Sequence, residues 1–269
     1  MESVVLNVGI KMPIVGSGTN TFGKENRDYM GKINGDTTEI LDAISLGYRH
    51  FDTAIMYRNE SVLGKALKES GINRSEFFIT SKITGTEEFY ADETSVRKGV
   101  ESSLKELDTN YIDLYLIHHP WEDLAGILKV WKVLEEYVDN GTLKAIGVSN
   151  FKEQELTYLT KNARIKPAVN QVESHPGNWN TELISTTLNL QVVPEAWGPL
   201  TRVSDATKTV LEKIGKKYDK TWAQVILRYQ IEQGVVVIPK SHNKERQSQN
   251  LEIFDFALTY DEKERIAKL

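Results

Sequence analysis

Short runs of β-branched and apolar residues alternate along this chain with longer segments in which apolar residues recur at helical spacing. Eight of these runs are expected to be strands, at residues 14–18, 48–52, 77–81, 112–117, 142–148, 168–171, 191–196 and 235–238. Their mostly apolar composition predicts a parallel sheet that is buried on both faces. Eight strand-then-helix units predict an α/β fold in which this sheet closes into an eight-stranded (β/α)8 TIM barrel.

The helical segments have recognisable ends. Residues 38–46 and 124–138 each place their apolar side chains on one stripe. Asp36 or Thr37 is expected to cap the first of these helices, and Gly141 is expected to end the second.

The first residues predict an N-terminal β-hairpin that turns at residues 7–9 and plugs the bottom of the barrel. No linker, repeat tract or low-complexity stretch interrupts the pattern. Residues 1–269 are therefore expected to form one barrel domain.

Polar or aromatic side chains end or closely follow seven of the predicted strands. They are Asp52, Lys82, His118, Asn150, Gln171, Trp197 and Lys240. A barrel of parallel strands brings its carboxyl ends to one rim, where active sites of such barrels lie. Each residue alone has an ordinary structural explanation, such as a helix cap for Asp52 or a hydrogen-bonded core histidine for His118. Their shared position on one rim predicts a functional site.

Composition limits the classes of partner. The formal net charge of −5 disfavours nucleic acid and anionic membranes, because both favour a basic surface. The absence of cysteine excludes disulfides and thiolate chemistry and suits a reducing compartment. No apolar run approaches the length of a membrane span, and the first residues lack the pattern of a signal peptide. A cytoplasmic location is expected.

Four of the candidate residues have complementary chemistry. Tyr57 follows Asp52 by a few residues, and Lys82 and His118 lie on neighbouring strand ends. A phenol titrates near pH ~10, so a nearby cation is needed to make it an effective acid at neutral pH. We expect Lys82 to supply that cation, Asp52 to hold Lys82, and His118 to bond the substrate oxygen. The set predicts reduction of a carbonyl group, with Tyr57 protonating the oxygen.

The segments around these residues follow the order of motifs in a known family. They are GYRHFDTA, ITSK, DLYLIHHP, LKAIGVSNF, KPAVNQVESHP, AWGPL and IPKSHNKER. Over about residues 4–260 the chain resembles the aldo-keto reductase family, in particular its short prokaryotic members. The resemblance implies a monomeric barrel that binds NADPH or NADP+ without a Rossmann domain and acts on a small carbonyl substrate. It also implies that Asp52, Tyr57, Lys82 and His118 are the catalytic residues.

The same resemblance implies where the cofactor binds. Ser149, Asn150 and Gln171 would hold the nicotinamide carboxamide, and Trp197 would stack on the ring. The other implied cofactor contacts are Gly18, Thr19, Asn20, Asp52, Gly198 and Leu200 near the nicotinamide, Lys240, Ser241, His242, Asn243 and Arg246 near the adenosine 2′-phosphate, and Gln249 and Asn250 near adenine. Arginine and lysine at that phosphate favour NADPH over NADH.

The substrate is expected to contact Phe22, Tyr57, His118 and His119. His119 occupies a position where the family commonly has tryptophan. An imidazole there removes apolar wall and adds a hydrogen-bonding group, so polar carbonyl compounds are expected to be favoured. The polar segment 23–35, with Tyr29, Met30 and Met56, is expected to complete the wall of the pocket.

Two other functions fit parts of the sequence. A barrel of this family can keep its NADPH site and serve a regulatory or structural role without turnover. A metal-dependent barrel hydrolase is suggested by the His118–His119 pair, but a second histidine–acid cluster at other strand ends is lacking, and no metal site is predicted. The intact set of four residues favours the reductase.

Overall fold

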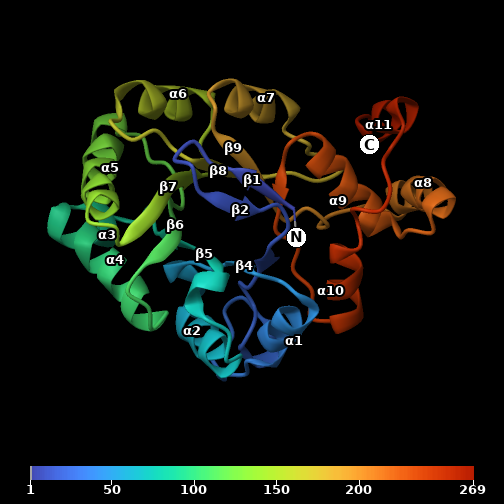
Figure 1. The fold of residues 1–269 in the computed structure, drawn as a ribbon. Coiled ribbons are helices and arrows are strands. Elements are labelled where there is room, and N and C mark those ends of the chain that lie inside the picture. Colours follow the sequence, from blue (N-terminus) through green and yellow to red (C-terminus); the bar gives the residue numbers. More distant parts are fainter. Residues whose placement is uncertain (1) are drawn as a thin grey trace.

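The computed structural model describes residues 2–269 and forms a barrel of parallel strands surrounded by helices (Figure 1). The eight strands are β3 (Ser17–Gly18), β4 (His50–Asp52), β5 (Phe78–Ile83), β6 (Ile112–Ile117), β7 (Leu143–Ser149), β8 (Val169–Glu173), β9 (Val193–Trp197) and β10 (Val236–Val237). They pair in chain order from β3 to β10. The predicted α/β barrel is confirmed.

The two edges of the sheet meet beside β3 and β10. Val15 and Val237 form a parallel bridge, and the Gly16 amide donates to the Val237 carbonyl over 2.8 Å. This joint closes the sheet. It involves few residues, which explains why β3 and β10 are shorter than the runs 14–18 and 235–238 that the sequence predicts, whereas β6 has its predicted bounds.

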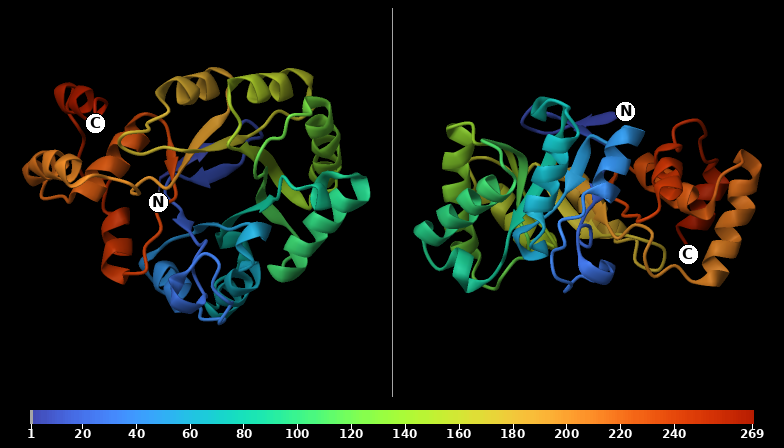
Figure 2. Two further views of the ribbon diagram at one scale, coloured as in Figure 1. Left: turned by 180° about the vertical axis from the view of Figure 1, so that it is seen from behind. Right: turned by 90° about the horizontal axis from the view of Figure 1, so that it is seen from below.

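The helices lie outside the strands and cover the sheet (Figure 2). They are α1 (Thr38–Leu46), α2 (Glu60–Glu69), α3 (Glu87–Tyr90), α4 (Glu93–Glu106), α5 (Leu124–Asp139), α6 (Glu153–Asn162), α7 (Thr181–Asn189), α8 (Asp205–Gly215), α9 (Trp222–Glu232), α10 (Lys244–Leu251) and α11 (Tyr260–Ile266). As predicted, Asp36 accepts a hydrogen bond from the Thr38 amide at the start of α1, over 2.9 Å. Gly141 follows α5 with φ of +79°, a left-handed conformation that glycine adopts without strain.

The N-terminal hairpin covers one end of the barrel, as predicted (Figure 2, right). Strands β1 (Ser3–Val5) and β2 (Lys11–Pro13) are antiparallel and are joined by a turn in which the Gly9 amide donates to the Leu6 carbonyl. The Asn7 side chain donates to the Pro167 carbonyl over 2.8 Å, directly before β8. The hairpin therefore closes the N-terminal ends of the strands and leaves the carboxyl ends for a site.

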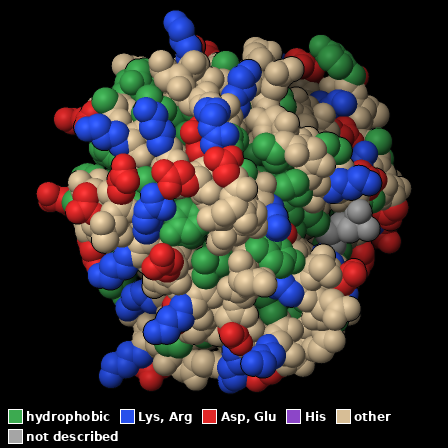
Figure 3. All heavy atoms as spheres, turned by 60° about the vertical axis from the view of Figure 1, so that its left-hand side comes forward, with side chains coloured by type: hydrophobic (Ala, Val, Ile, Leu, Met, Phe, Trp, Pro, Cys, Tyr) green, Lys and Arg blue, Asp and Glu red, His purple; other side chains and the backbone are tan. Residues whose placement is uncertain are grey.

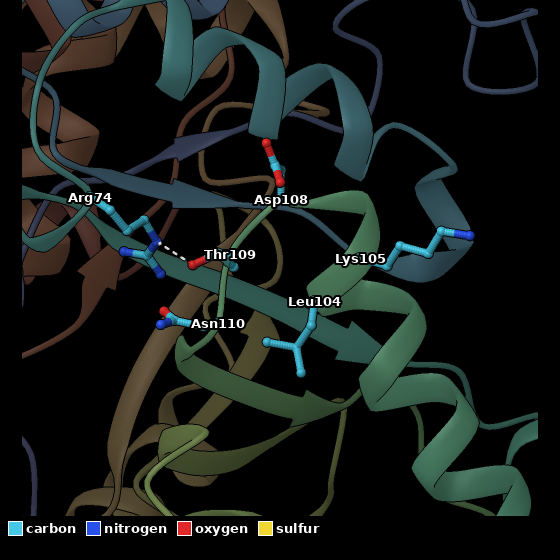
Figure 4. Close-up of a pocket in the computed structure, with 6 residues that line it drawn as sticks. All are labelled: Arg74, Leu104, Lys105, Asp108, Thr109 and Asn110. Atoms are coloured by element: carbon cyan, nitrogen blue, oxygen red, sulfur yellow. Dashed lines mark hydrogen bonds between the residues drawn. The ribbon is translucent and has the colours of Figure 1, made fainter.

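A shallow pocket at the hairpin end of the barrel is structural (Figure 4). Its one arginine, Arg74, donates to Thr109 Oγ1 over 3.2 Å, to the Phe77 carbonyl over 2.9 Å and to Asp113 Oδ2 over 2.7 Å. These bonds use the guanidinium to join the segments before β5 and β6. The pocket therefore offers little to a ligand.

Charges of both signs are interspersed on the face that carries α3, α4 and α5 (Figure 3). Arg97 of α4 pairs with Glu136 of α5 at 2.6 Å, and Arg164 pairs with Asp139 at 2.7 Å. Within residues 2–269, none of the helices has the length and apolarity needed to cross a bilayer.

Candidate active site

A cavity of about 490 Å³ opens at the carboxyl ends of the strands. Its wall is made by Gly18, Thr19, Asn20, Tyr29, Asp52, Met56, Tyr57, His118, His119, Ser149, Asn150, Gln171, Trp197, Gly198, Pro199, Leu200, Thr201, Arg202, Ile238, Pro239 and Lys240. Most of the residues singled out on the predicted rim are in this set. The closed barrel brings them together because parallel strands end on the same side.

Lys82 is the buried centre of the site. Its ammonium donates to Asp52 Oδ1 over 2.7 Å, to the Thr53 carbonyl over 2.9 Å and to Tyr57 Oη over 3.3 Å. Burial is the largest single effect and opposes a charge here, but the acidic groups around the ammonium, with Asp52 first among them, together outweigh burial, so the pKa of Lys82 is raised. Lys82 is therefore a permanent cation with all three N–H groups in use.

Tyr57 stands beside this cation at the end of a 3₁₀ turn, η2 (Ile55–Tyr57), after β4. Because Lys82 donates to the phenol oxygen, the O–H of Tyr57 itself remains available to a ligand. Burial raises the pKa of Tyr57 to about 12, although the charge on Lys82 acts in the opposite direction. The expectation that the cation brings the phenol toward neutral pH is thus corrected: burial is the larger effect, and Tyr57 holds its proton.

His118 follows β6, and its ring meets the Tyr57 ring edge to face, with centroids 5.6 Å apart. Burial and the neighbouring Lys82 lower the pKa of His118 to about 2, so the imidazole is neutral. Its Nδ1 is buried without a hydrogen-bond partner among the residues described. A proton on Nδ1 would be a buried donor without an acceptor, so the proton belongs on Nε2.

The Gln171 amide is oriented by two carboxyl groups. Its Nε2 donates to Asp52 Oδ2 over 2.8 Å and to Glu195 Oε2 over 2.6 Å. Both N–H groups are thereby used, and Oε1 remains as an acceptor in the cavity wall. Ser149 lies next to it and donates to the Gln171 carbonyl over 3.0 Å.

Glu195, in the middle of β9, is fully buried beneath Gln171. The three N–H groups of Lys82 already have other acceptors, and across residues 2–269 the only basic side chain within 4.0 Å of the Glu195 carboxyl is His50. Burial, followed by the Asp52 charge, raises the pKa of Glu195 to about 8. Glu195 is therefore protonated at neutral pH.

His50 is the base nearest to the Glu195 carboxyl. Its Nδ1 lies 3.2 Å from the Pro13 carbonyl, which can only accept, so Nδ1 carries the hydrogen. Burial lowers the pKa of His50 to about 4, so the ring is neutral and Nε2 carries no hydrogen. Nε2 contacts Thr80 Oγ1 at 3.3 Å and lies 3.5 Å from Glu195 Oε1, which makes no hydrogen bond among the described residues. The two side chains form a neutral pair under the site.

The stability of wild type is expected to fall with rising pH relative to that of the Glu195→Gln variant. The folded protein holds a proton on Glu195 between the ordinary glutamate pKa of ~4.3 and about 8, whereas the unfolded chain releases it. Over this window wild type should lose up to about 1.4 kcal/mol per pH unit relative to Glu195→Gln, which does not titrate. Urea unfolding of both proteins from pH 5 to pH 8 measures the difference; parallel pH curves would show that Glu195 is ionised in the folded state.

A second cavity of about 770 Å³ adjoins the first. It is lined by Leu200, Lys208, Glu212, Lys216, Lys220, Thr221, Trp222, Ala223, Lys240, Ser241, Arg246, Gln249 and Asn250. Leu200 and Lys240 line both cavities, so the two cavities lie side by side. Lys240 donates to Asn20 Oδ1 and to Thr21 Oγ1, each over 2.9 Å, and burial lowers its pKa. We call the two adjoining cavities together the trough; lysine and arginine side chains line the second of them.

Four of the predicted contacts lie outside the trough. Phe22 is fully buried, packs against the His242 ring and lines neither cavity. His242 contacts Glu39 Oε1 at 2.5 Å, and Asn243 caps α10 by accepting from the Arg246 amide over 2.9 Å. Met30 is 71% exposed and does not line the cavity, although Tyr29 and Met56 do.

The sequence analysis missed Glu195, Arg202 and the wall from α8 and α9. Glu195 had a signal, since a carboxylate interrupts the apolar run VVPEAW. Arg202 lines the first cavity and pairs with Glu173 of β8. Trp222 and Lys208 line the second cavity together with Arg246, and the Lys208 ammonium lies 5.6 Å from the Trp222 ring centroid. The sequence around Trp222 and Lys208 contains no signal for this placement. Within the described part of the chain, no group of three or more metal-ligating side chains is placed to hold a metal ion.

Comparison with known proteins gives consistent matches. The model of the aldo/keto reductase family matches residues 15–269. The chain is 41% identical over 268 residues to a glyoxal reductase of Bacillus subtilis (strain 168), covering 100% of this chain and 92% of that protein. An aldo/keto reductase structure from Brucella melitensis superposes with a TM-score of 0.89 at 36% identity, covering 99% of this chain and 98% of that chain. A Bombyx mori aldo-keto reductase in complex with NADP superposes with a TM-score of 0.88 at 33% identity, covering 98% of this chain and 91% of that chain.

Proposed function

The chain belongs to the aldo/keto reductase family and is an oxidoreductase, and from this premise we propose that it reduces aldehydes or ketones to alcohols with NADPH, using Tyr57 as the general acid. One observation carries the proposal. Lys82 donates to the phenol oxygen of Tyr57, which leaves the Tyr57 proton free to be given to a carbonyl oxygen in the cavity.

The side chains that line the trough suit NADPH by their chemistry. The first cavity offers the Gln171 Oε1 acceptor and the indole of Trp197 at the nicotinamide end. The second offers Lys240, Ser241 and Arg246 at the phosphate end, where charge-assisted hydrogen bonds would hold the adenosine 2′-phosphate. A family member of similar fold is complexed with NADP. When bound, NADPH supplies the hydride.

The protein's own residues would bind the substrate oxygen and protonate it. His118 donates from Nε2 to the substrate oxygen and aligns it with Tyr57, which transfers its proton to the same oxygen. Lys82 stabilises the resulting phenolate, and Asp52 holds Lys82 in place. Donors aimed at an oxygen on which charge develops contribute most when they are already oriented, as the buried His118 and the half-buried Tyr57 are by their mutual packing.

The direct test is the loss of NADPH absorbance with a panel of small aldehydes and ketones, run beside NADH. Turnover with NADPH would support the reductase. Tight NADPH binding without turnover of any carbonyl would favour the alternative of a non-catalytic, cofactor-binding barrel. A metal-dependent hydrolase would instead show activity that a chelator removes.

Arg246→Glu is expected to lower the affinity for NADPH about 10- to 100-fold while changing the affinity for NADH much less. Arg246 is exposed in the second cavity and makes no side-chain hydrogen bond to the described residues, so its guanidinium is free for a phosphate. A hydrogen bond to a charged group contributes about 1.5–3 kcal/mol, which corresponds to this range. Fluorescence titration with both cofactors measures it.

Lys244→Glu is the matched control. It makes the same charge reversal on α10, but Lys244 pairs with Asp42 at 2.7 Å and does not line the cavity. It is expected to affect NADPH far less. If Arg246→Glu weakened NADH as much as NADPH, a role at the 2′-phosphate would be excluded.

A further inference from the structure

The polar side chains expected at the nicotinamide carboxamide differ in how far the protein already occupies them. The Trp197 indole donates to Asn150 Oδ1 over 2.9 Å, and Asn150 Nδ2 lies 3.0 Å from the His118 carbonyl and 3.1 Å from Ser149 Oγ. Ser149 in turn donates to the Gln171 carbonyl over 3.0 Å. Gln171 Oε1, in contrast, accepts no hydrogen bond from residues 2–269 and belongs to the cavity wall.

The orientation of the Gln171 amide depends on two acceptors. Its Nε2 carries two hydrogens, which point to Asp52 Oδ2 at 2.8 Å and to Glu195 Oε2 at 2.6 Å. Because Gln171 is only 1% exposed, each of these N–H groups needs an acceptor from the protein. Two bonds from one nitrogen fix the plane of the amide and leave Oε1 as the end toward the cavity.

Asp52 alone would not hold the amide in this way. Without the Glu195 carboxyl, one N–H of Gln171 would be buried without an acceptor. Asp52 cannot move to accept both, since its Oδ1 is held by Lys82 at 2.7 Å. The terminal torsion of a glutamine is soft, so the amide would rotate until the unpaired N–H meets the cavity and Oε1 turns away from it.

Glu195 has the hydrogen-bonding pattern of an amide. Its Oε2 accepts from Gln171, so the proton that it holds at neutral pH belongs on Oε1, which faces the hydrogen-free Nε2 of His50 at 3.5 Å. One end of the carboxyl group therefore accepts and the other end donates. A glutamine at this position could present its oxygen to Gln171 and its NH2 group to His50, whereas an apolar side chain could do neither.

We propose that Glu195 is a positioning residue for the cofactor, which holds the Gln171 amide so that Oε1 accepts a hydrogen bond from the carboxamide NH2 group of the nicotinamide. The inference rests on the proposed function, in which NADPH and NADP+ bind in the trough. Its consequence is selectivity: a cofactor whose carboxamide NH2 is replaced by a methyl group would leave Gln171 Oε1 without a donor.

The test compares three ligands by fluorescence titration. They are NADP+, its 3-acetylpyridine analogue, in which the NH2 is a methyl group, and adenosine 2′,5′-bisphosphate, which lacks the nicotinamide. Wild type should bind NADP+ about three- to tenfold more tightly than the analogue, the range expected for one hydrogen bond. In Glu195→Met, an apolar side chain of similar length, this preference should fall below about twofold, while the affinity for adenosine 2′,5′-bisphosphate stays within about twofold of wild type.

Glu195→Gln should restore the preference for NADP+, because it supplies the acceptor again. If Glu195→Met does not fold, Glu195→Leu makes the same comparison. An unchanged preference in the apolar variant, or an equal loss of affinity for all three ligands, would overturn the positioning role of Glu195. A Glu195→Gln variant without the preference would overturn it as well.

The wild-type protein separates this inference from the proposed function. Equal affinity of wild type for NADP+ and the analogue would overturn the role of Glu195, whereas oxidation of NADPH by a carbonyl compound would still support the reductase. Failure of wild type to bind NADP+ or NADPH would refute the proposed function itself.

Discussion

Tyr57→Phe is expected to lower kcat by about 10²–10⁴ and to leave NADPH affinity nearly unchanged. The substitution removes the proton donor but keeps the ring, so the edge-to-face contact with His118 is retained. The pKa of about 12 means that the phenol is protonated at every pH at which the protein is assayed, so the loss should not depend on pH between 6 and 8. Single-turnover oxidation of NADPH, with a separate fluorescence titration of the cofactor, measures both quantities.

Tyr29→Phe is the control for this experiment. Tyr29 lines the same cavity and packs against Tyr57 with centroids 6.0 Å apart, but Lys82 donates to Tyr57 and not to Tyr29. Removing the Tyr29 hydroxyl should lower kcat less than about tenfold. Near wild-type turnover in Tyr57→Phe, or an equal loss in the two variants, would show that the proton comes from another group.

Lys82→Met is expected to abolish most turnover and to destabilise the fold by about 3–5 kcal/mol. Lys82 and Asp52 are an ion pair 2.7 Å apart, with side-chain exposures of 0% and 3%. Removing one partner leaves the other charge buried without compensation, which has a cost of this size. Turnover falls because the phenolate of Tyr57 loses its cation. Urea unfolding and NADPH oxidation are the measurements.

The double variant Lys82→Met with Asp52→Asn separates the two effects. It removes both charges, so it should recover much of the stability lost in Lys82→Met, while turnover stays as low. The asparagine oxygen can still accept from Gln171 Nε2, which keeps that amide in place. If the double variant were less stable than the single variant, Asp52 would not be the uncompensated charge.

The sequence was sufficient to predict the barrel and the residues at its carboxyl-terminal rim. Apolar periodicity depends only on neighbours along the chain, so it predicted all eight strands and the hairpin, with β6 at its observed bounds. Parallel strands must end on one side, so the order of residues alone indicates that Asp52, Lys82 and His118 meet at one rim. Strand ends were less predictable, because β3 and β10 depend on pairing across the closure at Val15 and Val237.

The tertiary structure alone decided the protonation states and the hydrogen-bond directions of the site. Burial of Tyr57 outweighs the cation beside it, and burial of Glu195 keeps that carboxyl neutral. The two acceptors that orient the Gln171 amide come from different strands, and one of them, Asp52, lies 119 residues away in the sequence. A pKa or a hydrogen-bond partner depends on every group packed around a side chain, and those groups become neighbours only when the barrel closes.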